Sequence, residues 1–278
     1  MPEVIVAVPT PFDATGGVDL AAVKERFAVL GASLDGLFVA GTTGEFPVLS
    51  DPERLALFET ALSVCPADRV IVHCGGSNAT GLTVRARELG ARRFAAITPS
   101  EDTEVDAYYR RIREAAGDGE VYAYLFPERT GLDLGPERLA RLLTDCDLTG
   151  AKLSGGAAAR FAGYRAAVPE GKRLYSGDDG MLPEMAAGGG AGIVSGVSSA
   201  FPVPFADLAA ALRTGDDEKV AVLAPRIRRL VAFFAASIPL MKQTWALRGY
   251  CRPDTRMAVE PAPPGAEVVL RSFIEEFG

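Results

Sequence analysis

The stretch GLFVAGTTGEFPVLSDPERLALFETALSVCPADRVIVHC (residues 36–74) holds two short apolar runs separated by one longer amphipathic segment. The runs 36–40 and 69–74 are continuously apolar rather than alternating, which is typical of parallel strands that are covered on both faces. Segment 50–64 is predicted to be a helix, because Ser50 and Glu53 have the spacing of a capping box at its start. The order strand, helix, strand predicts one unit of a parallel sheet.

The same pattern continues on both sides of this stretch. Further strands are predicted at 4–8, 94–98, 121–126, 149–153, 173–177 and 192–196, and further helices at 19–33, 104–116 and 135–145. Strand–helix units at this regular spacing predict an α/β fold, the (β/α)8 TIM barrel, which often runs to about 250 residues as one domain. The alternative is an open doubly wound sheet. A GxGxxG after the first strand would favour it, and TPFDATGG (10–17) does not match that motif.

The strand pattern ends at about residue 215. The remaining sequence is predicted to be a C-terminal helical region, interrupted by CRPDTRMAVEPAPPG (251–265). We therefore expect two parts, a catalytic barrel at residues 1–215 and the helical extension at residues 216–278.

Composition excludes several classes of function. The 278 residues are 48% hydrophobic, enough for a large core, and the net charge of −7 argues against nucleic acid or an acidic membrane as a partner. The four scattered cysteines form no CxxC pair, which suits reduced thiols better than a disulfide framework or a zinc site. The N-terminal apolar run is short and contains prolines, so we expect no secretion signal there, and no apolar run reaches the length of about 18 residues that a membrane span needs. We expect a soluble cytoplasmic protein that uses no cofactor and no metal.

In a barrel of this kind, the functional side chains lie where strands end and the following loops begin. The polar residues at those places are Thr42, Thr43, Glu45, His73, Cys74, Tyr124, Lys152, Asp178, Asp179 and Ser195. A lone histidine at a strand end is usually a packed or hydrogen-bonded residue, so we expect no metal site at His73.

Lys152 is the most informative of these residues. The chain has 24 arginines but only five lysines, and Lys152 lies between Ala151 and Leu153 in a predicted buried strand. Burial disfavours the ammonium form, and the free amine can attack a ketone to form an imine, which a guanidinium cannot do. The alternative is a structural lysine whose stem packs in the barrel while its head pairs with a carboxylate.

Tyr124 favours the catalytic interpretation. Strand alternation places Tyr124 and Tyr122 on the same face, so a ring can lie inside the barrel near Lys152. A tyrosine hydroxyl beside an imine can carry protons to and from the substrate. A strand tyrosine can equally be a core residue.

Four motifs occur in order along the chain: GTTGEF (41–46), YLFPERTG (124–131), GAKLSGG (150–156) and YSGDDGMLPEMAAGGGAGIVSG (175–196). With them the sequence resembles the dihydrodipicolinate synthase/N-acetylneuraminate lyase family of class I pyruvate aldolases. The resemblance implies that pyruvate forms a Schiff base with Lys152. It also implies that the other substrate is an aldehyde or keto acid and that the protein is a homotetramer or homodimer.

The resemblance also implies roles for the remaining site residues. Thr43 would hold the pyruvate carboxylate, and Thr42 would relay a proton with Tyr124, the general acid/base. Val194 would contribute a backbone carbonyl, and Gly177 would let the chain approach the substrate. Arg129 stands where synthases of the family bind the second substrate's carboxylate, or it forms an exposed salt bridge with Glu128 or Glu45. Asp178 and Asp179 either cap the next helix or contact substrate.

One departure from the family pattern keeps other functions open. Synthases of the family usually carry a tyrosine-rich stretch after strand four, whereas this chain has ITPSEDTEVDAYY (97–109), with Tyr108 and Tyr109 in the expected helix. Arg129 favours condensation of pyruvate with a carboxylated aldehyde. The missing loop tyrosine favours a 2-keto-3-deoxy sugar-acid aldolase or an N-acetylneuraminate lyase-like enzyme. A catalytically silent keto-acid-binding relative is the alternative from another class.

Overall fold

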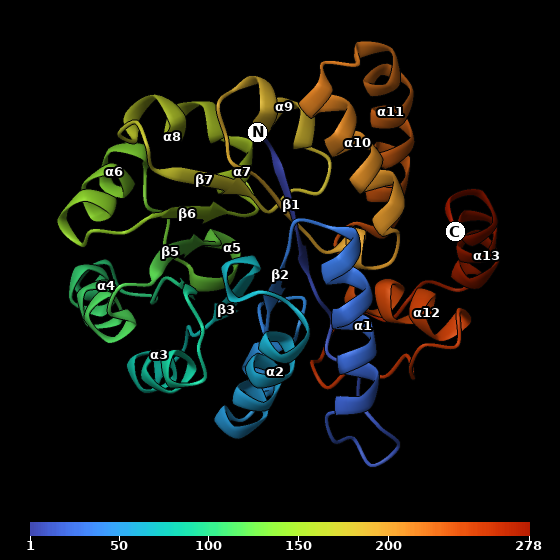
Figure 1. Cartoon of the computed structure of the whole chain (residues 1–278), viewed down its shortest axis with the longest axis horizontal. Coiled ribbons are helices and arrows are strands. Elements are labelled where there is room, and N and C mark those ends of the chain that lie inside the picture. Colours follow the sequence, from blue (N-terminus) through green and yellow to red (C-terminus); the bar gives the residue numbers. More distant parts are fainter.

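The computed structural model describes all 278 residues and contains a closed barrel of parallel strands in the order β1 to β8 (Figure 1). The strands are β1 (Glu3–Ala7), β2 (Gly36–Val39), β3 (Val70–His73), β4 (Arg93–Ile97), β5 (Glu120–Leu125), β6 (Gly150–Leu153), β7 (Arg173–Ser176) and β8 (Gly192–Ser195). Every strand predicted from the sequence is present, with its ends shifted by no more than about one residue. Because β1 pairs with β8, the sheet has no open edge, and the alternative of an open doubly wound sheet is wrong.

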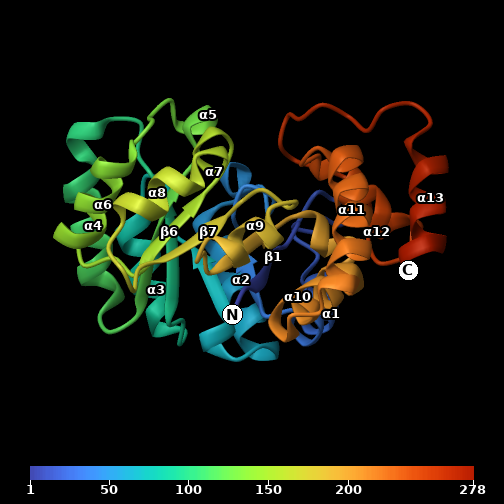
Figure 2. The ribbon, with the colours of Figure 1, turned by 90° about the horizontal axis from the view of Figure 1, so that it is seen from above.

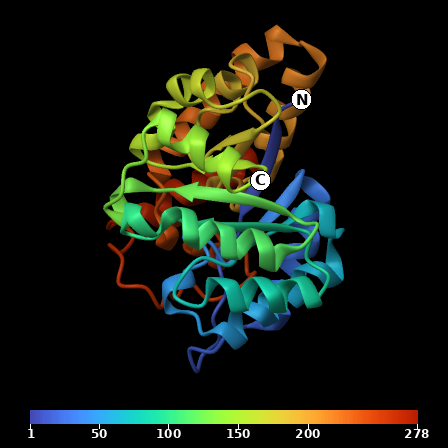
Figure 3. The same cartoon turned by 90° about the vertical axis from the view of Figure 1, so that its left-hand side faces the viewer.

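Helices alternate with the strands, and the longer ones cover the outside of the barrel (Figures 1 and 3). They are α1 (Leu20–Ser33), α2 (Asp51–Val64), α3 (Ala79–Glu88), α4 (Asp102–Ala116), α5 (Pro127–Thr130), α6 (Pro136–Asp145), α7 (Gly156–Ala159), α8 (Phe161–Ala167), α9 (Leu182–Ala187) and α10 (Pro202–Thr214). The predicted capping box of α2 is confirmed. The Ser50 hydroxyl accepts from the backbone N–H of Glu53, and the Glu53 carboxylate accepts from the backbone N–H of Ser50.

Three more helices form the C-terminal region: α11 (Asp217–Phe234), α12 (Ile238–Leu247) and α13 (Ala266–Phe277). They lie together beyond α10, on the side of the barrel away from α4 and α6 (Figure 2). The ring of Phe201, just before α10, packs edge-on against Phe234 of α11, with centroids 5.9 Å apart. The division of the chain at residue 215 remains a prediction from the sequence. No helix combines the length and the apolar character needed to cross a membrane.

The barrel interior is closed at the amino ends of the strands by a polar network. The Arg93 guanidinium donates to the hydroxyls of Tyr122 and Tyr175, and these hydroxyls donate in turn to the carboxylates of Glu120 and Glu3. A layer of apolar side chains lies inside the barrel with these tyrosines and includes Ile5, Ile71 and Ala95. The interior is therefore packed at its base with apolar side chains and paired polar groups.

Candidate active site at the carboxyl end of the barrel

A cavity of about 350 Å³ lies at the carboxyl ends of the strands. All seven residues that the sequence singled out as catalytic or substrate-binding line it: Thr42, Thr43, Tyr124, Arg129, Lys152, Val194 and Gly177. They come from the ends of five different strands or the loops that follow them, which the closed barrel brings to one place. The location of the predicted site is thus as expected for this fold.

Lys152 lies in the cavity with its amine over two aromatic rings. β5 and β6 pair with Tyr124 opposite Lys152, so the two side chains are neighbours on the inner face of the barrel. The Lys152 Nζ is 4.2 Å from the centroid of the Tyr124 ring and 4.6 Å from that of Phe38. The residue is 6% exposed. The amine thus lies against two ring faces, a cation–π arrangement.

Lys152 has no carboxylate within ion-pair distance, whereas the other buried lysine does. Lys242 donates to the Glu45 carboxylate at 2.5 Å, and both side chains are fully buried. The ion pairs of the chain include Lys242 and Lys219 among the lysines, but not Lys152. The interpretation of Lys152 as a packed lysine with a carboxylate partner is therefore wrong for Lys152, and it describes Lys242 instead.

The hydroxyls of Thr42 and Tyr124 are 3.1 Å apart, and either can be the donor. Thr42 lies in the turn after β2. The backbone N–H of Tyr124 donates to the hydroxyl of Tyr109, which belongs to α4 outside the barrel. Tyr109 in turn donates to the carbonyl of Ala96, so Tyr124 is fixed from outside the barrel. A hydroxyl pair beside a lysine amine is an arrangement that can move a proton near an imine.

The neighbouring turn holds Thr43 close to the eighth strand. A Cβ on Gly196 would lie 3.4 Å from the Thr43 hydroxyl and 2.8 Å from the Met241 methyl group. Glycine at position 196 therefore lets Thr43, Met241 and the end of β8 approach one another at the cavity wall.

The structure gives a reason for the glycine at position 177 that the sequence did not reveal. A Cβ at this position would clash with the hydroxyl of Ser154, which lies two residues after Lys152. Ser154 also lines the cavity and is 5% exposed. The glycine makes room for this side chain, and the resemblance-based role of Gly177 in approaching the substrate remains a prediction.

Arg129 lies on the short helix α5 at the rim of the cavity. Its guanidinium carbon is 5.7 Å from the centroid of the Phe126 ring, and it forms no ion pair. Neither expected salt-bridge partner is used: the Glu128 carboxylate accepts from the backbone N–H of Gly156 at 2.7 Å, and Glu45 is paired with Lys242. The salt-bridge interpretation is wrong, and the Arg129 guanidinium is left without a protein anion.

The interpretation of Asp178 and Asp179 as helix caps is also wrong. α9 begins at Leu182, and no side chain caps it. The Asp178 carboxylate accepts from the backbone N–H of Gly180 at 2.9 Å. Asp179 accepts from the Ser195 hydroxyl and from the backbone N–H of Val197. Burial raises the pKa of the Asp179 carboxyl, although these two hydrogen bonds lower it. Both aspartates line the cavity.

Part of the cavity wall comes from the C-terminal region, which sequence reasoning missed. Five residues around the turn between α11 and α12 line it: Val231, Ala235, Ala236, Ile238 and Met241. Two of them, Ala235 and Ala236, have positive φ angles of 43° and 59°, a conformation rare for residues other than glycine. All five side chains are apolar and carry no reactive group, so neither residue type nor spacing could have indicated a role in a site.

Glu45 has the structural function that its motif suggests. It is fully buried with a φ of 61°, and its second carboxylate oxygen accepts from the backbone N–H groups of Arg256 and Met257. Through Glu45 and Lys242 the turn that carries Thr42 and Thr43 is bound to the C-terminal region.

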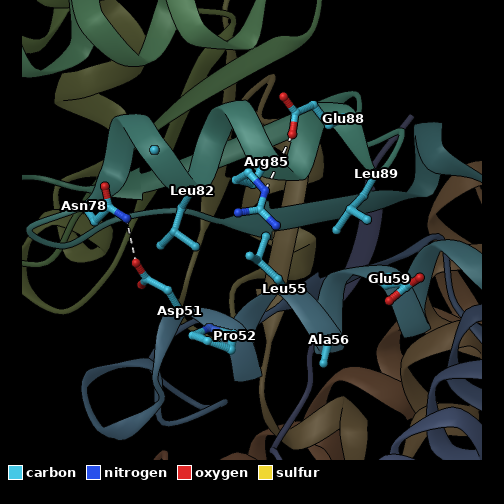
Figure 4. A pocket seen from close by; sticks show the side chains of 11 residues that line it. Asp51, Pro52, Leu55, Ala56, Glu59, Asn78, Leu82, Arg85, Glu88 and Leu89 are labelled. Carbon is cyan, nitrogen blue, oxygen red and sulfur yellow. Dashed lines mark hydrogen bonds and ion pairs between the residues drawn. The ribbon is translucent and has the colours of Figure 1, made fainter.

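A second hollow, of about 530 Å³, lies outside the barrel between α2 and α3 (Figure 4). Two pairs of its polar side chains interact: Asn78 donates to Asp51 at 2.6 Å, and Arg85 pairs with Glu88, on the same helix, at 3.6 Å. It contains no lysine, and its rim faces solvent. The smaller cavity is the one that holds a buried lysine amine, that of Lys152, beside the Tyr124 ring. No group of three His, Cys, Asp or Glu side chains could hold a metal ion.

Comparison with known proteins shows the family to which the chain belongs. The sequence model of the dihydrodipicolinate synthetase family matches residues 1–267. The chain belongs to this family. A 4-hydroxy-tetrahydrodipicolinate synthase of Thermosynechococcus vestitus is 30% identical over 288 residues, covering 99% of this chain and 97% of the relative. A second, from Synechococcus sp. (strain CC9605), is 34% identical over 260 residues, covering 89% of this chain and 86% of the relative.

Solved structures of the family have the same fold. The crystal structure of dihydrodipicolinate synthase from Aquifex aeolicus superimposes with a TM-score of 0.89 at 25% identity, covering 100% of this chain and 98% of that one. A dihydrodipicolinate synthetase from Pseudomonas aeruginosa, described as putative, superimposes with a TM-score of 0.91 at 26% identity and full coverage of both chains. The barrel and the C-terminal helices are therefore both part of the family fold.

Proposed function

We propose that the protein is a class I aldolase that condenses pyruvate with a carboxylated aldehyde, as a 4-hydroxy-tetrahydrodipicolinate synthase does. The observation that carries the proposal is the buried amine of Lys152, unpaired and directly beside Tyr124. Membership of the family and the names of the relatives support the same reaction.

In the proposed reaction the Lys152 amine attacks the ketone of pyruvate, and loss of water gives an imine. Removal of a proton from the methyl group gives an enamine, whose carbon attacks the aldehyde to form the new C–C bond. Tyr124, with Thr42 at 3.1 Å, takes and returns the protons of these steps. Hydrolysis of the imine then releases the product and regenerates Lys152.

The remaining cavity residues supply binding. Thr43 holds the pyruvate carboxylate, and the carbonyl of Val194 lies near the bound keto acid. Arg129, whose guanidinium has no protein partner, meets the carboxylate of the aldehyde. A planar fork binds a carboxylate through two parallel hydrogen bonds, which gives orientation as well as affinity.

Reductive trapping tests the proposal. Pyruvate with borohydride is expected to leave one irreversible adduct per chain, and peptide mapping is expected to place it on Lys152. Lys152→Ala and Lys152→Arg are both expected to abolish trapping, since the imine needs an amine and not a charge. Lys172→Arg is the matched control, because Lys172 lies away from the cavity and donates to the carbonyl of Leu148. Trapping that persists in Lys152→Ala, or none in the wild type, would overturn the mechanism.

A second aldehyde class is supported by the loop after β4. Only four residues, 98–101, connect β4 to α4, and none of them is a tyrosine. Tyr108 and Tyr109 lie within α4, so this loop supplies no tyrosine to a site. This favours a 2-keto-3-deoxy sugar-acid aldolase or an N-acetylneuraminate lyase-like activity. A panel of aldehydes offered with pyruvate decides between the classes, and no turnover with any of them, despite trapping, would indicate a silent keto-acid-binding protein.

We also infer a homotetramer or homodimer from the resemblance, and a cytoplasmic location from the four free cysteines. The apolar stretch 230–241 gives no support for an interface. Leu230, Phe234 and Leu240 are buried within the chain itself, and Val231, Ala235, Ala236, Ile238 and Met241 line the cavity. Sedimentation equilibrium at micromolar concentration tests the assembly, and a monomer would contradict it.

A further inference from the structure

His73, the only histidine of the chain, joins three neighbouring strands at the edge of the active site. It is the last residue of β3 and is fully buried. Its Nδ1 lies 3.0 Å from the carbonyl oxygen of Ala40, just after β2, and its Nε2 accepts from the backbone N–H of Ile97, in β4, at 3.2 Å. Because Nε2 faces a donor and Nδ1 an acceptor, the geometry specifies a neutral ring with its proton on Nδ1.

The bond to Ala40 acts on the turn that carries Thr42. Ala40 has a φ of 52°, a left-handed conformation that costs free energy for any residue with a Cβ. It lies two residues before Thr42, so its conformation sets the direction in which the turn leaves β2. The imidazole N–H is the side-chain donor that holds the Ala40 carbonyl in this conformation.

The same ring packs against Tyr124. The centroids of the His73 and Tyr124 rings are 5.9 Å apart at an interplanar angle of 82°, an edge-to-face contact. On its other side the imidazole packs against Phe46, with centroids 4.5 Å apart. His73 therefore contacts the Tyr124 ring directly and is connected to Thr42 through the backbone at Ala40.

The charged groups around His73 keep it neutral. The Arg54 guanidinium, from α2, donates to the backbone carbonyl of His73 at 2.5 Å, and Lys152, from β6, lies on the cavity side. Burial, reinforced by these two cations, holds the pKa of His73 well below its usual range. The acceptor at Nε2 is consequently preserved.

We propose that His73 is a positioning residue for catalysis, which sets the contact between Thr42 and Tyr124 by holding the left-handed turn at Ala40. The inference rests on the proposed function, because turnover by the Lys152 imine is its readout. Only the Nδ1–H donor is required for this role, while the acceptor at Nε2 secures β4.

Two substitutions distinguish the roles of the two imidazole nitrogens of His73. His73→Asn retains a donor near the position of Nδ1, and His73→Gln places its amide near the position of Nε2. We expect His73→Gln to lower kcat by about 10- to 100-fold, the order of loss that follows a misplaced catalytic group, while saturating pyruvate is still trapped on Lys152. His73→Asn is expected to retain most of the turnover. Val72→Ala is the matched control, because this neighbour in β3 is equally buried but packs in the outer core.

The nitrogen-15 NMR spectrum of the imidazole in the wild-type protein gives a second readout. It depends neither on activity nor on whether a variant folds. The single histidine is expected to show a protonated Nδ1 and a bare Nε2. The proposal is overturned by a proton on Nε2, by equal losses in His73→Asn and His73→Gln, or by a loss that Val72→Ala reproduces at equal stability. Failure of the wild type to trap pyruvate would instead reject the proposed function, and the positioning role would fall with it.

Discussion

The hydroxyl oxygens of Thr42 and Tyr124 lie 3.1 Å apart, although 82 residues separate them in the chain. One belongs to a turn after β2 and the other to the inner face of β5, so only closure of the barrel brings them together. Both lie beside the Lys152 amine, and in the proposed reaction the amine is the nucleophile and the two hydroxyls are the route for protons.

Replacement of Tyr124 by phenylalanine tests that route. The ring face under the Lys152 amine is retained, so pyruvate is still expected to be trapped on the lysine, although more slowly. Turnover is expected to fall roughly 10²–10⁴-fold, the usual worth of a positioned acid–base group. Rapid-quench trapping and steady-state assays separate the two effects. Tyr164→Phe is a control, because the Tyr164 hydroxyl donates to the carbonyl of Leu134, away from the cavity. Turnover near that of the wild type would place the proton route elsewhere.

Replacement of Arg129 by alanine tests recognition of the second substrate. For a carboxylated aldehyde, loss of a charge-assisted pair is expected to cost about 1.5–3 kcal/mol, or roughly 10–150-fold in kcat/KM. A neutral aldehyde such as glyceraldehyde is expected to be affected little, and imine formation hardly at all. If both aldehydes suffer equally, Arg129 holds its loop rather than binding substrate. A wild type that prefers glyceraldehyde would favour the sugar-acid aldolase.

The buried pair of Glu45 and Lys242 predicts a large effect on stability. Lys242→Met leaves the Glu45 carboxylate buried without its cation, and loss of one partner of a buried pair typically costs about 3–5 kcal/mol. Urea unfolding measures the change. Lys219→Met is the matched control, since that lysine pairs with Asp216 at the surface and is expected to contribute no more than about 1 kcal/mol. Equal effects of the two substitutions would show that the C-terminal region is not held by this contact.

The pH dependence of stability has a component from His73. Its pKa in the folded protein is well below the unfolded value of about 6.5, so between these values the unfolded chain binds the extra proton. The free energy of unfolding is therefore expected to decrease as the pH falls below about 6.5, by at most about 1.4 kcal/mol per pH unit. Above that pH His73 is neutral in both the folded and the unfolded chain, so its contribution to the free energy of unfolding no longer changes with pH.

Unfolding by urea between pH 8 and pH 5, in the wild type and in His73→Asn, isolates this component, since the variant lacks the titrating group. The difference between the two curves is expected to shrink toward acid pH. A difference that stays constant would mean that His73 is free to take up a proton in the folded protein.

The amino-acid sequence by itself determined the barrel. Continuous apolar runs, capped helices and regular spacing are local features, so they can be recognised without knowledge of the fold. The strand ends then indicated the residues that line the candidate site, and the scarcity of lysine singled out Lys152 among them. Only the tertiary structure decided which charges are paired. Lys152 and Lys242 are both buried lysines, and the difference between them is the carboxylate of Glu45, which is 197 residues from Lys242 in the chain. The same holds for the apolar wall at Ala235 and for the hydrogen bonds of His73, because contacts between distant segments depend on barrel closure and leave no trace in local residue patterns.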